Sequence, residues 1–195
     1  MEDDTDSVGQ IGRDARHDQA GLGVDDLQRL WAPWRFGYVA GAEPLEGCPF
    51  CVLPQRGPDR DRESLILHRG RHCFVIFNAY PYNPGHLMVV PYQHVAELEE
   101  LPDDAAYELW DLARRSVAVL KQQVNAQGVN LGMNLGAAGG AGIAEHLHLH
   151  AVPRWVGDTN FISVVGAARV LPRALEEMWD ELAPGFADEA ASESA

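Results

Sequence analysis

The stretch His146-Leu147-His148-Leu149-His150-Ala151-Val152 alternates imidazoles with apolar side chains. Because successive side chains of a β-strand point to opposite faces, this alternation predicts a strand over residues 145–152. The three histidines would share one face, spaced about 7 Å apart, while the intervening leucines and alanine would pack into a core. Thr or Val would pair equally well with neighbouring strands, so a face built of imidazoles indicates chemistry rather than plain structure.

The rest of the chain predicts a sheet and helices around this strand. Apolar runs bounded by turn residues predict strands over 64–67, 73–77, 86–90 and 129–134. The longest helical pattern opens at Pro102-Asp103-Asp104 and should end near Gln127, with Gly128 just beyond its C-terminus. A last helix is expected over 172–182. The fold class is therefore α+β, with a mostly antiparallel sheet, one long helix and a C-terminal helix.

Composition limits the domain organisation and the partners. The 195 residues suit one domain over 26–183, between an acidic mobile tail at 1–25 and a disordered tail at 184–195. The formal charge is −14, which argues against nucleic acid because its phosphates are met by clustered Lys and Arg. No stretch approaches the roughly 20 apolar residues of a membrane span, and the N-terminus is acidic where a signal peptide is basic. We therefore expect a cytoplasmic protein without nucleic-acid or membrane partners.

Three histidines at strict alternation can bind a metal or perform nucleophilic or acid–base catalysis. One metal would have to reach the outer two rings, which lie about 13 Å apart along a strand. Four glycines between Asn134 and Gly142 can bring backbone amides close to an anion, although no Gly-Lys-Ser/Thr ending makes this a P-loop. A neutral imidazole is a competent nucleophile when its second nitrogen is held by an acceptor. These two features favour catalysis over metal binding.

This pattern resembles the signature of the histidine triad (HIT) family, His-x-His-x-His-x-x with apolar x. The resemblance spans about residues 28–175, and within it the chain is similar to the bacterial branch that includes diadenosine tetraphosphate phosphorylases. Further blocks that resemble the family are Leu30-Trp31-Ala32-Pro33-Trp34-Arg35, Cys48-Pro49-Phe50-Cys51, Asn83-Pro84-Gly85-His86-Leu87, Pro91-Tyr92-Gln93-His94, Pro153-Arg154-Trp155 and Gly157-Asp158-Thr159-Asn160-Phe161.

The resemblance implies a HIT-like fold and an enzyme that transfers or hydrolyses nucleotidyl groups. His148 would attack the α-phosphorus and form a covalent nucleotidyl-histidine, with His146 and His150 completing the catalytic triad. His150 would donate a hydrogen bond to a phosphate oxygen or the leaving group. Water or inorganic phosphate would then release the nucleotide. The resemblance also implies the residues that contact the substrate. Asn134 and the amides of Gly140, Gly142 and Ile143 would bind the α-phosphate, Asn78 the ribose and Phe50 the base. His86 would be a further imidazole of the active site, and the segment of Trp155 would contact a dinucleotide substrate.

One position departs from the family pattern. Near residue 143 many relatives carry Ser or Thr as a phosphate contact, whereas this chain has Gly142 followed by Ile143. Either the backbone amides suffice here, or the substrate preference differs.

Cys48 and Cys51 have the spacing of a zinc knuckle, which needs two further ligands. The third cysteine, Cys73, begins an apolar strand and is expected to be a buried thiol. The resemblance points to His94 and His146 as the missing ligands of a structural zinc. Two free thiols, or a redox Cys-x-x-Cys, are the alternatives, and the redox version lacks a βαβ context.

Three functions remain open at this stage. The first is cleavage of diadenosine polyphosphates, by phosphorolysis or by hydrolysis. The second is hydrolysis of nucleoside phosphoramidates, and the third is a nucleotide- or metal-binding module without turnover. The length of the segment 158–182 favours the larger dinucleotide substrate. The resemblance further implies a homodimer or a higher homo-oligomer.

Overall fold

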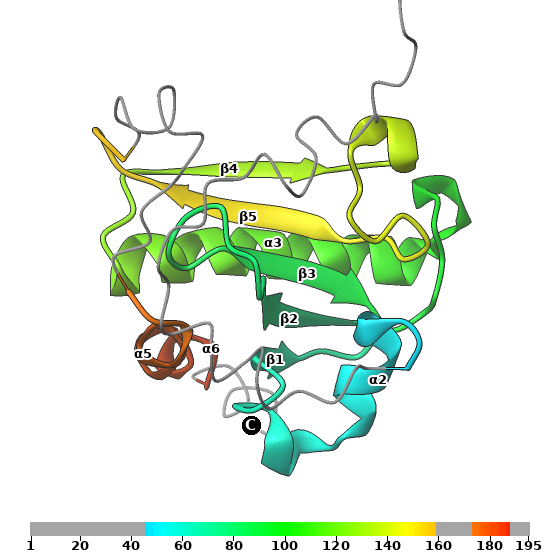
Figure 1. The fold of residues 1–195 in the computed structure, drawn as a ribbon, viewed down its shortest axis with the longest axis horizontal. Coiled ribbons are helices and arrows are strands. Elements are labelled where there is room, and N and C mark those ends of the chain that lie inside the picture. The colour runs from blue at the N-terminus through cyan, green and yellow to red at the C-terminus, as the bar shows by residue number, and fades with distance from the viewer. Residues whose placement is uncertain (1–45, 159–172, 188–195) are drawn as a thin grey trace, which may run out of the picture.

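The computed structural model describes residues 46–158 and 173–187. The acidic segment at 1–25 and the apolar segment at 26–39 lie outside these residues. Five strands form one antiparallel sheet in the order β1-β2-β3-β5-β4 (Figure 1), which confirms the predicted α+β class. The strands are β1 (Ile66–Arg69), β2 (Cys73–Phe77), β3 (Leu87–Pro91), β4 (Gly128–Met133) and β5 (Leu149–Arg154).

The long helix α3 (Asp103–Gln123) lies against one face of the sheet, behind it in the view of Figure 1. Asp103 and Asp104 in its first turn favour the positive end of the helix dipole. The helix ends before the predicted position, because Asn125 takes a left-handed φ of 53° and reverses the chain. Gly128 is therefore not the residue after the helix but the first residue of β4.

The face of the sheet that meets α3 carries the main core. Leu149 and Ala151 of β5 are fully buried there, as the alternating pattern predicts, and so is the Cys73 thiol of β2. The C-terminal helices α5 (Leu175–Leu182) and α6 (Pro184–Ala187) close one end of this core. Phe186 of α6 is buried, so the folded body continues past the boundary predicted at residue 183.

A smaller apolar cluster covers the other face of the sheet. The short helix α2 (Pro49–Gln55) packs Phe50 against Ile76 of β2 and Met88 of β3, while the alternate residues of these strands face α3. Three 3₁₀ turns lie in the connections: η2 (Pro58–Arg60), η3 (Leu98–Glu100) and η4 (Ala137–Gly139). None of the helices described in 46–158 and 173–187 combines the length and apolarity of a bilayer span.

The alternation predicted one continuous strand over residues 145–152, but in the structure the strand begins only at Leu149. Pairing of β5 begins at Leu149, so His146 and His148 precede the ladder and only His150 lies within it. The backbone N–H of Leu147 donates to the carbonyl of Val95, 2.7 Å away in the loop before α3, instead of to a neighbouring strand. This bond takes the chain out of the ladder and turns His146 toward that loop.

Candidate active site

His148 lies at a cavity of about 1030 Å³ on the face of the sheet opposite α3. Its Nδ1 is 2.8 Å from the carbonyl oxygen of His146, and because a carbonyl only accepts, Nδ1 donates. Burial lowers the pKa of His148, which favours the neutral ring. The proton of that neutral ring is on Nδ1, so Nε2 carries a lone pair.

His150 and His86 form a buried pair beside His148. The backbone N–H of Tyr82 donates to His86 Nδ1 at 3.1 Å, so His86 carries its proton on Nε2 and donates to His150 Nδ1 at 3.0 Å. His150 in turn carries its proton on Nε2, a buried atom that has no hydrogen-bond partner among residues 46–158 and 173–187. A donor with no partner beside a nucleophile can stabilise charge that develops on a ligand.

Burial keeps both rings of this pair neutral. It lowers the pKa of His86 to about 3, helped by repulsion from the imidazoles of His150 and His148. It lowers the pKa of His150 to about 4, with His148 adding to the effect. The chain of donors from Tyr82 through His86 to His150 therefore persists across the neutral pH range.

The cavity joins an apolar wall to a polar end. Phe50 and Leu53 of α2 form part of the wall, and the ring of Phe50 lies 5.2 Å from that of His148 between centroids. The polar end brings together His148, His150, Asn78 and Asn134, residues from three separate parts of the chain. Gly142 and Ile143 from the glycine-rich segment also line it.

Two residues that the sequence predicted as substrate contacts, Gly140 and Trp155, do not line the cavity at His148. Gly140 accepts a hydrogen bond on its carbonyl from the Asn134 side chain at 3.4 Å. Trp155 donates its indole N–H to the carbonyl of Asn125 at 3.0 Å and packs on the core. Their contact with a substrate stays a prediction.

Sequence reasoning missed Tyr82 and Ser64, which also line the cavity. The ring of Tyr82 lies 4.6 Å from His86 and 5.8 Å from His150 between centroids. Ser64 has a buried hydroxyl that makes no hydrogen bond within the described part of the chain. Tyr82 stands in a turn-rich run of Asn, Pro and Tyr, and no local pattern separates it from its neighbours.

Cys48, Cys51, His94 and His146 gather at the N-terminus of α2, with their ligand atoms all within 4.8 Å of one another. His146 Nε2 donates to the carbonyl of Pro91 at 2.9 Å, which leaves the lone pair of Nδ1 directed at the two thiols. Separations of 3.2–3.6 Å between these atoms are close to the edges, about 3.3–3.8 Å, of a tetrahedron with Zn–N and Zn–S bonds. The four residues fit a metal of this geometry.

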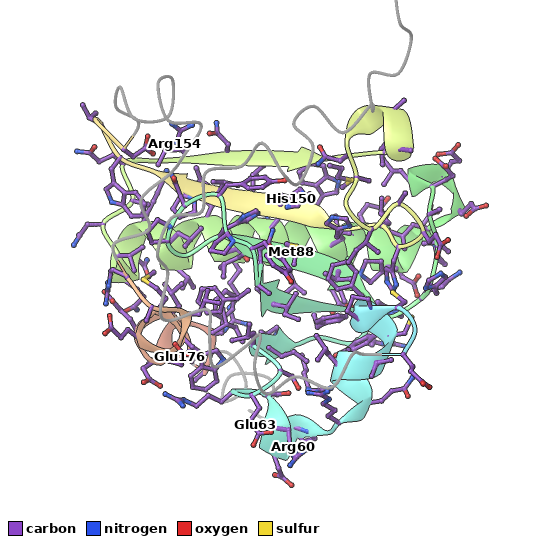
Figure 2. All side chains as sticks on the ribbon, in the orientation of Figure 1. Arg60, Glu63, Met88, His150, Arg154 and Glu176 are labelled. Atoms are coloured by element: carbon purple, nitrogen blue, oxygen red, sulfur yellow. The ribbon has the colours of Figure 1, made fainter. Side chains whose placement is uncertain are left out.

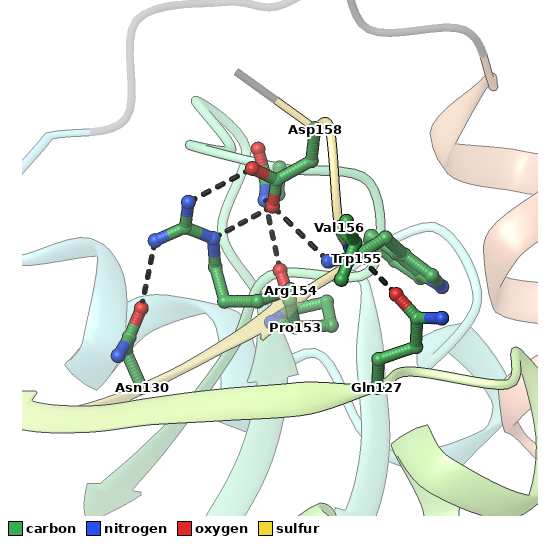
Figure 3. Close-up of polar contacts among 8 residues, drawn as sticks. Gln127, Asn130, Pro153, Arg154, Trp155, Val156 and Asp158 are labelled. Atoms are coloured by element: carbon green, nitrogen blue, oxygen red, sulfur yellow. Dashed lines mark hydrogen bonds and ion pairs between the residues drawn. The ribbon is translucent and has the colours of Figure 1, made fainter.

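A polar network fixes the loop that carries His86. The Asp158 carboxylate accepts from the Arg154 guanidinium at 2.6 and 2.8 Å and from the Asn83 side chain at 2.8 Å (Figure 3). Asn83 also donates to the carbonyl of Pro153 at 2.8 Å, and its own carbonyl accepts from the backbone N–H of His86. The network thus ties the end of β5 to the turn immediately before His86.

Known proteins share both the sequence and the fold. A family model described as the HIT domain matches residues 60–156. A Mycobacterium tuberculosis protein named AP-4-A phosphorylase is 44% identical over 163 residues, which cover 78% of this chain and 81% of that protein. A protein of Dictyostelium discoideum named bis(5'-adenosyl)-triphosphatase is 31% identical over 98 residues, or 50% of this chain and 65% of that protein.

A solved structure of a Zn-bound histidine triad family protein from Mycobacterium smegmatis has a TM-score of 0.59 and 24% identity, covering 74% of this chain and 96% of that one. This likeness concerns the fold. The domain match and the extended identity to the mycobacterial relative together establish that the chain belongs to the HIT family.

Proposed function

We propose that this chain cleaves dinucleoside polyphosphates by transferring a nucleotidyl group to His148. The observation that carries the proposal is the hydrogen bond from His148 Nδ1 to the carbonyl of His146, which reserves the lone pair of Nε2 for attack. The names of two relatives, AP-4-A phosphorylase and bis(5'-adenosyl)-triphosphatase, support the same substrate class.

The first step is a displacement at the α-phosphorus. The lone pair of His148 Nε2 forms an N–P bond, and the bond from phosphorus to the bridging oxygen breaks with its electron pair leaving on that oxygen. The Nε2–H of His150 donates a hydrogen bond to the departing oxygen, whose charge grows in the transition state. His86 holds His150 in the tautomer that can donate.

The second step frees His148. An oxygen of inorganic phosphate, or of water, attacks the same phosphorus, and the N–P bond breaks with its electron pair returning to Nε2. Phosphate yields a nucleoside diphosphate, whereas water yields a nucleoside monophosphate and releases a proton. We favour phosphate as the acceptor because the relative with 44% identity is named a phosphorylase.

The nucleoside of the transferred half would occupy the cavity of about 1030 Å³. The apolar wall that includes Phe50 suits a base, and Asn78 at the polar end suits the ribose hydroxyls. Asn134 and the backbone of Gly142 and Ile143 would hold the α-phosphate. This assignment needs no Ser or Thr at residue 143, since amide hydrogens bind phosphate oxygens.

Cys48, Cys51, His94 and His146 would hold a structural zinc ion. Two thiolates and two imidazoles are ligands that zinc prefers, and four protein ligands leave no position for a reacting water. When bound, the ion supplies a rigid cross-link rather than reactivity. It would fix the start of α2 to a residue two positions before the nucleophile.

The predicted homo-oligomer has support from apolar side chains at the surface. Tyr107 and Trp110 of α3 are exposed, as is Leu131 on the edge strand β4. Among the described residues, β4 pairs with another strand on one side only. A sheet edge of this kind and exposed aromatic rings favour association with a second copy of the chain.

Product analysis with diadenosine tetraphosphate, with and without inorganic phosphate, tests the function. ADP and ATP formed only with phosphate establish phosphorolysis, whereas AMP and ATP formed without it establish hydrolysis. His148→Ala should abolish both, while His72→Ala, a change at a half-buried side chain that does not line the cavity, should retain activity. If the wild-type chain cleaves neither this substrate nor a nucleoside phosphoramidate, the enzyme proposal fails and a binding module remains.

A further inference from the structure

A second groove, of about 560 Å³, continues from the main cavity along β4 and β5. The two spaces share Tyr82, Asn134 and His150, but only the main cavity is lined by His148. The groove is lined by Pro81, Tyr82, Asn130, Leu131, Gly132, Asn134, His150, Val152 and Arg154.

We propose that this groove binds the leaving nucleotide, a nucleoside polyphosphate, during the first step of the reaction. This inference rests on the proposed function. In a displacement at phosphorus, the attacking and leaving atoms lie roughly in line on opposite sides. With the transferred half beside His148, the bridging oxygen departs on the side of His150, whose ring centroid lies 4.8 Å from that of His148. The groove begins at that ring and lacks contact with the nucleophile.

Gly132 gives the groove its room beside the breaking bond. It lies in the interior of β4, directly opposite His150 in the register. Its φ is not left-handed, so the backbone does not require glycine, and a Cβ there would meet no atom within 4 Å. Glycine weakens a strand interior, and it often marks a place where a ligand approaches closely.

Arg154 lies at the far end of the groove, where the Asp158 carboxylate pairs with its guanidinium. It lies on the same strand as His150 (Figure 2). Because it follows His150 by four residues, the two are about 13 Å apart along the strand. Asp158 and Asn130 hold its guanidinium in one orientation (Figure 3). Near the start of the groove, the half-exposed ring of Tyr82 lies 5.8 Å from that of His150 between centroids and forms an aromatic part of the wall. The chemistry from His150 outward suits phosphates and a nucleoside.

Gly132→Phe tests the proposal by filling the groove. Two substrates are compared: diadenosine tetraphosphate, with a bulky leaving group, and the imidazolide of AMP, with a small one. The ratio of kcat/KM for the first to kcat/KM for the second should fall about tenfold or more, because only the first leaving group needs the groove. Val156→Phe is the matched control, since Val156 is 91% exposed and lines neither space. Its ratio should equal that of the wild type.

Asn130→Trp repeats the test at an exposed position of the edge strand if Gly132→Phe does not fold. A ratio that stays at the wild-type value in the folded variant overturns the groove assignment, even though the enzyme still works. A wild-type chain that turns over neither substrate overturns the proposed function, and the groove assignment with it.

Discussion

Two histidines separated by one residue carry their protons on different nitrogens. His146 donates from Nε2 to the carbonyl of Pro91, and His148 donates from Nδ1 to the carbonyl of His146. The lone pairs that remain point to different places, one to the cysteines and the other to the cavity. Neighbouring histidines of one motif can therefore serve the proposed metal site and the proposed nucleophile, because each ring meets a carbonyl with a different nitrogen.

The role of His86 as a donor can be tested with two substitutions. His86→Leu removes the hydrogen bond to His150 Nδ1, so His150 can shift its proton to Nδ1 and present a lone pair to the leaving oxygen. We expect kcat to fall about 100-fold with little change in KM, as for a lost proton donor. His86→Gln keeps an amide donor and should recover part of the loss. Equal kcat values for the two folded variants, in steady-state kinetics, would contradict this role.

Position 85 is one that only glycine can occupy without strain. It has a φ of 81°, and a Cβ there would meet Met178 Cε at 3.0 Å and Pro153 Cγ at 3.4 Å. Gly157 has nearly the same φ of 83°, but a Cβ there would meet nothing within 4 Å. Gly157→Ala should therefore cost about 1 kcal/mol from backbone strain alone, and Gly85→Ala about 2–3 kcal/mol. Urea unfolding of both variants measures the difference, and equal losses would exclude a contribution from the contacts.

At the scale of elements, the sequence predicts best where local pattern and burial agree. The strand over 73–77 is confirmed residue for residue because turn residues bound an apolar run that is buried on both faces. The prediction for the histidine segment was wrong in its first half, although the alternation is that of a strand. There, Leu147 and His146 hydrogen-bond to the carbonyls of Val95 and Pro91, which are distant in the sequence, and the backbone leaves the sheet. The end of α3 depends on Asn125, which is less distinctive than the glycine three residues later.

The residues of the candidate site were likewise predictable from the sequence only where a local motif marks them. The cysteine spacing and the alternating histidines stand in local motifs, so the sequence alone singled them out. Their partners are remote in the chain: Cys51 lies 43 residues from His94, and His86 lies 64 residues from His150. Only the resemblance pointed to His94 and His86. No local pattern marked Tyr82 or Gly132, whose places depend on the register of the sheet and the course of the loop.

The proposed zinc ion should determine whether α2 keeps its place. A helix of seven residues is marginal by itself, so the position of Phe50 depends on the anchoring of its first turn. Cys48→Ser should lower both the zinc content, measured by elemental analysis, and the Tm, and it should raise KM for the nucleotide. Cys73→Ala is the control, because it removes a thiol of the core and should leave one zinc per chain. Wild-type protein purified without any metal would contradict the zinc proposal.

At the scale of the whole molecule, the two faces of the sheet differ in the side chains that they bury. The face that packs on α3 is apolar and carries the larger of the two buried clusters. The opposite face buries His86, His148 and His150 beside the cavity, although a buried imidazole resists protonation. Burial therefore keeps these rings neutral at the proposed active site and makes the cluster sensitive to acid.

This cluster should make the whole fold less stable in weak acid. Above pH 6.5 both the folded and the unfolded imidazoles are neutral. As the pH falls below 6.5, the unfolded chain takes up protons that folded His86 and His150, with pKa values of about 3 and about 4, do not. The unfolded state then binds more protons, so the free energy of unfolding should fall by about 2 kcal/mol for each ring between pH 7 and pH 5. Urea midpoints at pH 7, 6 and 5 measure this loss. It should shrink in His150→Gln and persist in His72→Gln, and a midpoint that does not move by pH 5 would show that the two rings are not held neutral by the fold.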